Sequence, residues 1–501
     1  MALIERIAHR GIAERHAPWP RTVVDDVGWA QASDLLVAGQ CTLLGLWGDG
    51  TSVHMALLGE GRDVVVLTYS CRGGAYPSVA ARHPPALRLE RAIDALFGLK
   101  ASGSPDTRSW IDLGFWEIEH PLGARRPARP PEPYPFLPAE GDGLHQVAVG
   151  PVHAGIIEPG HFRFTANGEH VVRLEQRLGF VHKGIESLMT NASLEQAAKL
   201  AARTSGDSTV AYAFAFAQAV EAALGVKLPP RAVHLRALMA ELERLANHFG
   251  DIGGICNDAS FALMHAQCGI LRERTLRASA ACFGHRLMMD VIVPGGLARG
   301  IALGGEAAVH ALLAEVRRVF PRLVELYDNT ASLQDRTVTT GIVKPDYARQ
   351  FGAGGYIGRA SGRNFDARRD LAYAPYDTLS FDVPVLDAGD VNARVWIRIR
   401  EVEQSLSLLE QLLDRLPDGA ESIALPPVTQ GCEGLGFAEA FRGDVLVWLR
   451  IDGNGRIERC HLRDASWFQW PLVETAIEGN IVADFPLCNK SFNCSYSGHD
   501  L

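Results

Sequence analysis

A proline-rich stretch constrains the fold of this chain more than any other feature. Between residues 121 and 142, proline occurs at seven positions, which are Pro121, Pro127, Pro130, Pro131, Pro133, Pro135 and Pro138. Proline lacks a backbone N–H and clashes with the preceding helical turn, so no regular helix or central strand can run through this stretch. Such segments are stiff and extended. The sequence therefore predicts two folded units, at residues 1–120 and 143–501, joined by a linker at residues 121–142.

Composition excludes several classes of protein. Apolar residues make up 47% of the 501 residues and charged residues 21%, as in ordinary globular proteins. The net charge of −9 and the lack of a long basic run argue against a nucleic-acid partner. No apolar run is long enough to span a bilayer, and the first ten residues lack the apolar core of a signal peptide. We therefore expect a cytoplasmic protein that reaches a membrane only through partner subunits.

The N-terminal unit has the pattern of a small α/β domain. Apolar runs at residues 41–47, 52–58 and 63–69 are typical of strands, and Gly-Asp-Gly-Thr between the first two indicates a hairpin. Residues 87–98 carry apolar side chains at helical spacing and end on Gly98, a residue that often terminates helices.

The second unit is predicted to be mainly helical, with strands near its ends. Asn167-Gly168 indicates a hairpin turn before a strand at residues 170–175. Helices are expected at residues 194–224, 231–248, 261–289, 306–326 and 401–416, the fourth interrupted by Pro321. Further strands are expected at 444–451 and 456–462. The predicted fold class is α+β, with a small N-terminal α/β domain and a large, mainly α-helical domain that has peripheral β-strands.

The stretch at residues 150–164 carries the most chemistry. His153, Glu158 and His161 lie on a turn punctuated by Gly and Pro, which suits a proton-handling or metal site. The simpler interpretation is a surface turn with solvated polar groups. Two further polar segments follow, at residues 177–186 and at residues 203–208.

These segments resemble a known family. Together with residues 241–248, 359–362 and 389–394, they look like the large subunit of energy-converting membrane-bound nickel–iron hydrogenases of the formate hydrogenlyase type, and like the homologous quinone-site subunit of respiratory complex I. The resemblance runs from Gly150 to the last residue. Residues 76–108 are similar to the smaller complex I subunit that pairs with the quinone-site subunit, and the chain resembles a fusion of the two.

The resemblance implies a nickel–iron centre whose ligands are absent here. The family holds these metals with four cysteine thiolates, in two pairs. The first pair corresponds to Ser205 and Ser208, and the second to Ser495 and Gly498, with Cys494 one place too early. A neutral hydroxyl is a poor ligand for a soft metal. We therefore expect no nickel–iron centre and no metal held by this chain.

The nine cysteines support no other cluster. None forms a Cys-x-x-Cys pair, so an iron–sulfur cluster within this chain is not expected. We expect most of them to be buried as small apolar residues.

The quinone contacts implied by the resemblance are missing as well. The complex I subunit has a His four residues after the first motif His, and a Tyr in the helix of the Arg motif. The corresponding residues here are Ile157 and Gly206. A quinone could still bind between subunits, without these two polar contacts.

Proton-handling residues remain in the motif segments. Glu158 matches the hydrogenase carboxylate that passes protons from the metal, and burial near the turn would raise its pKa. His153 and His182 can join such a path, with Arg203 and Asp207 as further candidates. The alternatives are a structural salt bridge between Glu158 and Arg203, and a helix-capping role for Asp207, which we favour.

Three hypotheses about function follow from the resemblance. The first is a large subunit without its metal, in a membrane complex related to hydrogenase-4 and complex I that couples electron transfer to proton or ion translocation. The second is a quinone-reducing subunit with a remodelled pocket, and the third a scaffold for proton coupling without redox chemistry. The implied partners are an iron–sulfur small subunit, which would carry the clusters, and antiporter-like membrane subunits, on the cytoplasmic face of the inner membrane.

Overall fold

The computed structural model describes residues 3–11, 15–153 and 157–501. The N-terminal unit contains a four-stranded sheet in the order β2-β5-β4-β3, built from β2 (Arg21–Val24), β3 (Cys41–Asp49), β4 (Ser52–Gly59) and β5 (Val64–Ser70). Helices α1 (Asp26–Val37) and α2 (Leu87–Phe97) accompany it. Apolar side chains fill both faces of β4 and β5, which is why these runs read as continuous apolar stretches. The three predicted strands and the predicted helix are confirmed.

Helix α2 ends where the sequence predicted. Gly98 takes a left-handed conformation with φ of 72°, which glycine adopts without steric cost. Short strands β6 (Ala75–Pro77) and β7 (Lys100–Ser102) pair nearby, as do β8 (Ile118–Glu119) and β9 (Arg126–Pro127). Residues 128–140 form neither helix nor strand.

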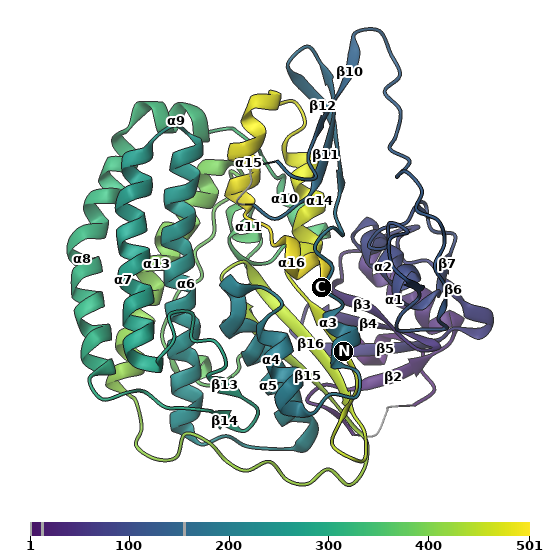
Figure 1. Cartoon of the computed structure of the whole chain (residues 1–501), viewed down its shortest axis with the longest axis horizontal. Coiled ribbons are helices and arrows are strands. Elements are labelled where there is room, and N and C mark those ends of the chain that lie inside the picture. The colour runs from purple at the N-terminus through teal and green to yellow at the C-terminus, as the bar shows by residue number, and fades with distance from the viewer. Residues whose placement is uncertain (1–2, 12–14, 154–156) are drawn as a thin grey trace.

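Long helices form the body of the second unit, and most of them stand at the left of Figure 1. They are α5 (Thr209–Leu224), α6 (Pro230–Asp258), α7 (Ala262–Phe283), α8 (Gly305–Asn329) and α13 (Val391–Asp414). Shorter helices connect and cover them: α3 (Ile185–Met189), α4 (Leu194–Ala202), α9 (Ala331–Thr337), α10 (Pro345–Gln350), α11 (Gly355–Ala360), α12 (Ala367–Asp370), α14 (Ser466–Ala476), α15 (Phe485–Phe492) and α16 (Tyr496–Asp500). The mixed α+β class is confirmed.

Three strands form a sheet beside the bundle, namely β15 (Cys432–Ala440), β16 (Gly443–Ile451) and β17 (Ile457–Arg463). The N-terminal β1 (His16–Ala17) adds a parallel fourth strand next to β15. Trp47 of β3 packs near Trp448 of β16, with ring centroids 5.6 Å apart. Arg463 donates a hydrogen bond of 2.7 Å to the carbonyl oxygen of Leu44. The hydrophobic core therefore continues between the two predicted units.

A second antiparallel sheet projects at the top of Figure 1. It contains β10 (Leu144–Val149), β11 (His161–Asn167) and β12 (His170–Arg177), and the predicted turn at Asn167-Gly168 joins the last two strands. The proline-rich segment lies against its neighbours on both sides. Tyr134 accepts a hydrogen bond of 2.8 Å from Arg91 of α2, and the Leu137 N–H donates to Glu175 of β12 at 2.9 Å.

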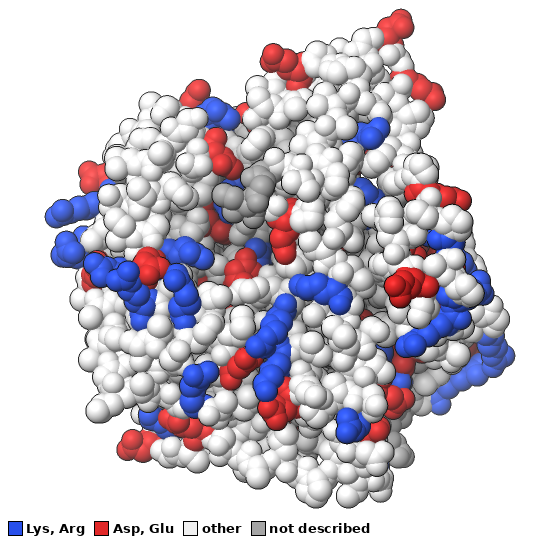
Figure 2. Space-filling view, viewed as in Figure 1, with Lys and Arg blue, Asp and Glu red and all other residues white. Residues whose placement is uncertain are grey.

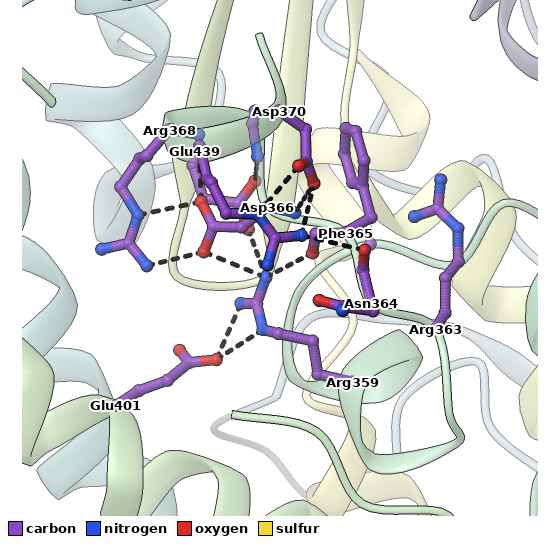
Figure 3. Close-up of polar contacts among 12 residues, drawn as sticks. Arg359, Arg363, Asn364, Phe365, Asp366, Arg368, Asp370, Glu401 and Glu439 are labelled. Carbon is purple, nitrogen blue, oxygen red and sulfur yellow. Dashed lines mark hydrogen bonds and ion pairs between the residues drawn. The ribbon is translucent and has the colours of Figure 1, made fainter. Parts of the chain in front are cut away.

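A buried ion-pair network ties four elements together (Figure 3). Arg359 of α11 lies within 3.3 Å of carboxylate oxygens from Asp366, Glu401 and Glu439. Arg368 of α12 binds Asp366 in turn, at 2.7 Å. These charges are stable away from water only because each faces an opposite charge and further hydrogen bonds. The network therefore fixes α11, α12, α13 and β15 relative to one another.

The predicted helices differ from the structure in their bounds. Helix α6 continues to Asp258 rather than ending at residue 248, and α7 ends at Phe283 rather than at residue 289. The long helix predicted at residues 194–224 is wrong, because the chain turns at residues 203–208 and forms two helices, α4 and α5. Pro321 does not interrupt α8, since it lies on the exposed side where water can satisfy the carbonyl left without a partner. Helix α13 begins at Val391 rather than at residue 401, with Asp390 as its N-cap.

Charges of both signs are mixed on the surface. Figure 2 shows Lys and Arg side chains interspersed with Asp and Glu on the face in view. All nine cysteines are buried, as expected. Among the described helices, none is long and apolar enough to cross a membrane.

Candidate functional site

Two turns that are far apart in the sequence meet at a group of hydroxyls. Ser205 lies between α4 and α5, and Ser495 lies at the start of α16. Their Oγ atoms are 3.2 Å apart, although 290 residues separate them. We call Ser205, Ser208, Ser495 and Gly498 the serine junction. These are the four positions where the resemblance implies thiolates.

Local hydrogen bonds explain both turns. The first turn follows α4, a helix that begins with a capping box formed by Ser193 and Gln196. The Thr209 hydroxyl holds this turn together by donating a hydrogen bond of 2.7 Å to Ala202 O. Ser and Asp side chains compete with helical hydrogen bonds, which is why the predicted continuous helix breaks here. The second turn is a helix N-cap, in which Ser495 Oγ accepts the Gly498 N–H at 2.9 Å.

Asp207 is held by an ion pair, and the predicted helix-capping role is wrong. Its Oδ2 lies 2.7 Å from Nη2 of Arg442, and its Oδ1 lies 2.9 Å from Nη1. Burial raises the pKa of Asp207, but the Arg442 guanidinium and the Ser205 and Ser208 hydroxyls outweigh that effect and lower the pKa to about 2. Asp207 is therefore ionised throughout the physiological range.

Arg442 was missed by sequence reasoning. It lies between β15 and β16, it is 4% exposed, and its guanidinium also donates to Ser208 Oγ at 3.3 Å. No local motif marks it, because its partner is 235 residues away in the sequence. A charged residue in a tight hairpin turn between two apolar strands was the only available signal.

Glu158 lies on the surface and contacts the turn that carries Ser495 and Gly498. Its Oε2 accepts a hydrogen bond of 3.1 Å from the Ser497 N–H. The expectation that Glu158 is buried is wrong, because its side chain is exposed to solvent. The preceding motif residues 154–156 lie outside the described part of the chain.

The remaining candidates lie around the junction rather than in it. Arg203 does not pair with Glu158; its guanidinium binds Asp290 through contacts of 2.6 and 2.7 Å. The His182 Nδ1–H donates to Asp500 O at 2.7 Å, and the ring stacks on Trp116. The structure thus brings Asp207 into contact with two junction serines and leaves Arg203 at the surface.

His153 lies in the wall of an apolar cavity of about 290 Å³ next to the junction. Ile157, Phe485, Lys490, Cys494 and Tyr496 also line this cavity. The Tyr496 hydroxyl lies 3.4 Å from His153 Nε2, and burial lowers the pKa of His153. A neutral imidazole and a phenol at one end of an apolar cavity can bind a small amphipathic molecule.

The residues of the junction do not fit a nickel–iron centre. Ser205, Ser208 and Ser495 present hydroxyls, and Gly498 has no side chain. A Cβ atom at position 498 would lie 2.6 Å from Asp464 Oδ2 and 2.9 Å from Ser495 Oγ. Burial raises the pKa of the Cys494 thiol, so this side chain supplies no thiolate at neutral pH. Within the described residues, no group of three or more His, Cys, Asp or Glu side chains is placed to hold a metal ion.

Comparison with known proteins shows the family. The chain is 32% identical to formate hydrogenlyase subunit 5 of Escherichia coli (strain K12), over 85% of this chain and 77% of that protein. The chain belongs to the family of formate hydrogenlyase subunit 5. It is also 31% identical to hydrogenase-4 component G of the same organism, over 90% of this chain and 80% of that protein. Residues 258–431 match the model of the 49 Kd subunit of respiratory-chain NADH dehydrogenase. The resemblance stated from the sequence is confirmed.

A solved structure shows the same fold for most of the chain. A chain of the membrane-bound sulfane sulfur reductase, an archaeal respiratory membrane complex, superposes with a TM-score of 0.68. The match covers 72% of this chain and 99% of that chain, at 24% sequence identity. At this identity the likeness establishes the fold alone.

Proposed function

We propose that this chain is the large subunit of a membrane-associated oxidoreductase complex, related to hydrogenase-4 and complex I, which works without a nickel–iron centre. In that complex the chain links an iron–sulfur subunit to antiporter-like membrane subunits, on the cytoplasmic face of the inner membrane. Electron transfer is coupled there to the movement of protons or other ions. Iron–sulfur clusters belong to the partner subunits in this proposal.

One observation carries the proposal. The two turns of the serine junction meet with 3.2 Å between Ser205 Oγ and Ser495 Oγ, in a chain whose fold matches that of a chain of a respiratory membrane complex. At the four positions where the resemblance implies thiolates, this chain has three hydroxyls and a glycine, with the Asp207–Arg442 pair beside them. The chain thus keeps the architecture of its relatives without the sulfur ligands of the centre.

Metal analysis of the natively purified complex tests the proposal. We expect iron, from clusters in partner subunits, and no stoichiometric nickel, together with no nickel signal in electron paramagnetic resonance. Stoichiometric nickel that follows this chain on subunit separation would contradict it, and loss of that nickel in a Ser205→Ala variant would place it at the serine junction. An intact complex with neither metal would favour a scaffold for proton coupling without redox chemistry.

A second candidate function is quinone binding, which the 290 Å³ cavity favours. Its apolar wall suits a hydrophobic ring and tail, and the His153 and Tyr496 side chains offer hydrogen bonds to a carbonyl oxygen. A photoreactive quinone should label residues 485–496 in the complex, and an unlabelled short-chain quinone should compete. Replacing Ile157 with Trp narrows the cavity and should abolish labelling. Equal labelling of this variant and the wild type would contradict quinone binding in this cavity.

A further inference from the structure

A second, smaller cavity lies on the other side of the Asp207 turn. Its volume is about 20 Å³, and its lining combines apolar residues of α6 and α7 with the polar residues Asp207, Glu243, Asn247, Arg272, Ser279 and Arg286. A cavity of this size has room for about one water molecule, and carboxyl, amide and hydroxyl groups around it supply the necessary hydrogen bonds. The cavity lies between the turn, α6, α7 and the segment after α7.

Glu243 of α6 borders this cavity and also binds backbone N–H groups at the N-terminus of α5. Its carboxyl oxygens accept hydrogen bonds from the N–H groups of Val210, at 2.7 Å, and Ala211, at 3.1 Å. These are free donors of the first helical turn, because the N-cap residue Ser208 makes no side-chain capping bond. The adjacent Arg244 does not neutralise Glu243, since it pairs with Glu241 at 3.3 Å.

The surroundings of Glu243 favour its protonated form. The side chain is 8% exposed, and burial raises its pKa to about 8, an effect that Asp207 adds to. The two backbone N–H groups and the Arg244 charge oppose this shift. The other charged groups around the cavity are Arg272 of α7 and Arg286 in the segment after α7. Arg442 forms its ion pair with Asp207.

Hydrogen bonds connect the cavity to the serine junction. Asn247 Nδ2 donates to Asp207 O at 2.8 Å and to Glu243 O at 2.9 Å, and so holds the turn against α6. On the far side of the turn, Ser205 Oγ donates to Asp207 Oδ1 at 2.7 Å. Asp207 thus takes part in the hydrogen bonds of the junction and also belongs to the lining of the cavity.

We propose that Glu243 is a proton-carrying residue, which exchanges its proton through this cavity with the surface near Arg272 and Arg286. In the transfer, the O–H bond of the carboxyl breaks and the proton bonds to water in the cavity. The electron pair stays on the carboxylate, which the Val210 and Ala211 N–H groups stabilise. The inference deepens the proposed function, because ion coupling needs groups that bind and release protons near neutral pH.

Infrared difference spectroscopy of the purified complex tests this inference. The wild type should show the carbonyl band of a protonated carboxyl that disappears as pH rises through about 8. Glu243→Gln should lose this band, while its amide oxygen can still accept from Val210 and Ala211. Glu90→Gln is the matched control, because Glu90 is 2% exposed and also accepts two backbone N–H bonds, from Val79 and Ala80, but lies in the N-terminal unit. A titrating band that remains in Glu243→Gln overturns the inference.

A second variant tests the route through the cavity. A Cβ atom at Gly206, which lines the cavity, would meet no other atom within 4 Å, so Gly206→Leu can cover the cavity without a backbone clash. Exchange of the Glu243 band in D2O should become slower than in the wild type. Unchanged exchange of the Glu243 band would refute the route. Nickel in the complex would overturn the proposed function but leave both spectroscopic outcomes intact.

Discussion

The Asp207 carboxylate and the Arg442 guanidinium form a two-point ion pair, at 2.7 and 2.9 Å, that joins the turn before α5 to the loop between β15 and β16. Asp207 also accepts a hydrogen bond from Ser205, and Arg442 donates one to Ser208. A carboxylate and a guanidinium therefore hold together the turns where the resemblance implies the thiolates of a metal centre. The two groups satisfy each other's hydrogen bonds.

Removing the charge of Asp207 should destabilise the protein. Asp207→Asn leaves the buried Arg442 without its anion, and we expect a loss of about 1–3 kcal/mol in the free energy of unfolding. The value is below that of a fully buried pair, because the Asp207 side chain is 35% exposed and solvent screens it. Urea unfolding measures the loss. The control is Asp290→Asn, whose exposed pair with Arg203 should contribute about 0–1 kcal/mol; equal losses in the two variants would contradict the prediction.

Glu243 should make stability depend on pH. Below its ordinary pKa of 4.5 the carboxyl is protonated in both states, and between 4.5 and about 8 only the folded protein keeps the proton. Stability is therefore lost as pH rises across this window, by up to a few kcal/mol. In Glu243→Gln this contribution is absent, so the variant should gain stability relative to the wild type from pH 5 to pH 8. Glu195→Gln, at an exposed glutamate, should show no such trend; a constant difference between Glu243→Gln and the wild type across pH would rule out the raised pKa.

The effect of replacing a junction residue with cysteine should depend on its position. Ser205→Cys, Ser208→Cys and Ser495→Cys change one atom each, and the triple variant should bind Cd²⁺ with a thiolate charge-transfer absorption. Gly498→Cys should instead destabilise the protein, because its Cβ would lie 2.6 Å from Asp464 Oδ2. Asp464 cannot move freely, since it accepts hydrogen bonds from Tyr212 and the Ser466 N–H, both at 2.8 Å. Melting temperatures of Gly498→Cys and Ser497→Cys test this, and equal values would refute the steric argument.

Breaking the ion-pair network of Figure 3 should lower the free energy of unfolding. Arg359→Met leaves Glu401, Glu439 and Asp366 without their shared cation, all at 2% exposure or less. Removing one partner of a buried ion pair costs about 3–5 kcal/mol. Arg349→Met is the control, because its pair with Asp346 is exposed on both sides and should contribute less than about 1 kcal/mol. Thermal unfolding that fails to separate these two variants would show that the network is not stabilising.

Much of the fold was predictable from local patterns. The strands at 41–47, 52–58 and 63–69 are continuous apolar runs, and Gly98 ends α2 because it can adopt a left-handed backbone conformation. The break at residues 203–208 was not predicted, since its apolar neighbours on both sides follow one helical pattern. What breaks the helix is competition from the Ser205, Asp207 and Thr209 side chains. Thr209 bonds locally to Ala202 O, whereas Ser205 and Asp207 also have partners in distant parts of the chain, Ser495 and Arg442. The first turns of α13 were missed although Val391, Val395 and Ile399 are apolar and follow helical spacing. Arginines lie between these residues and are buried in the fold, Arg398 by its ion pair with Asp251.

The sequence alone determined which atoms are available for chemistry at the junction. Hydroxyls at Ser205, Ser208 and Ser495 and the absence of a side chain at Gly498 follow from residue type, and no folding can change them. Only the tertiary structure decided which groups meet: Asp207 with Arg442, Glu243 with the start of α5, and Glu158 with solvent. The physical reason is that ion pairing and desolvation depend on distances across the folded molecule. The protonation state of a carboxyl such as that of Asp207 therefore depends on residues hundreds of positions away. The sequence shows only that the carboxyl is present.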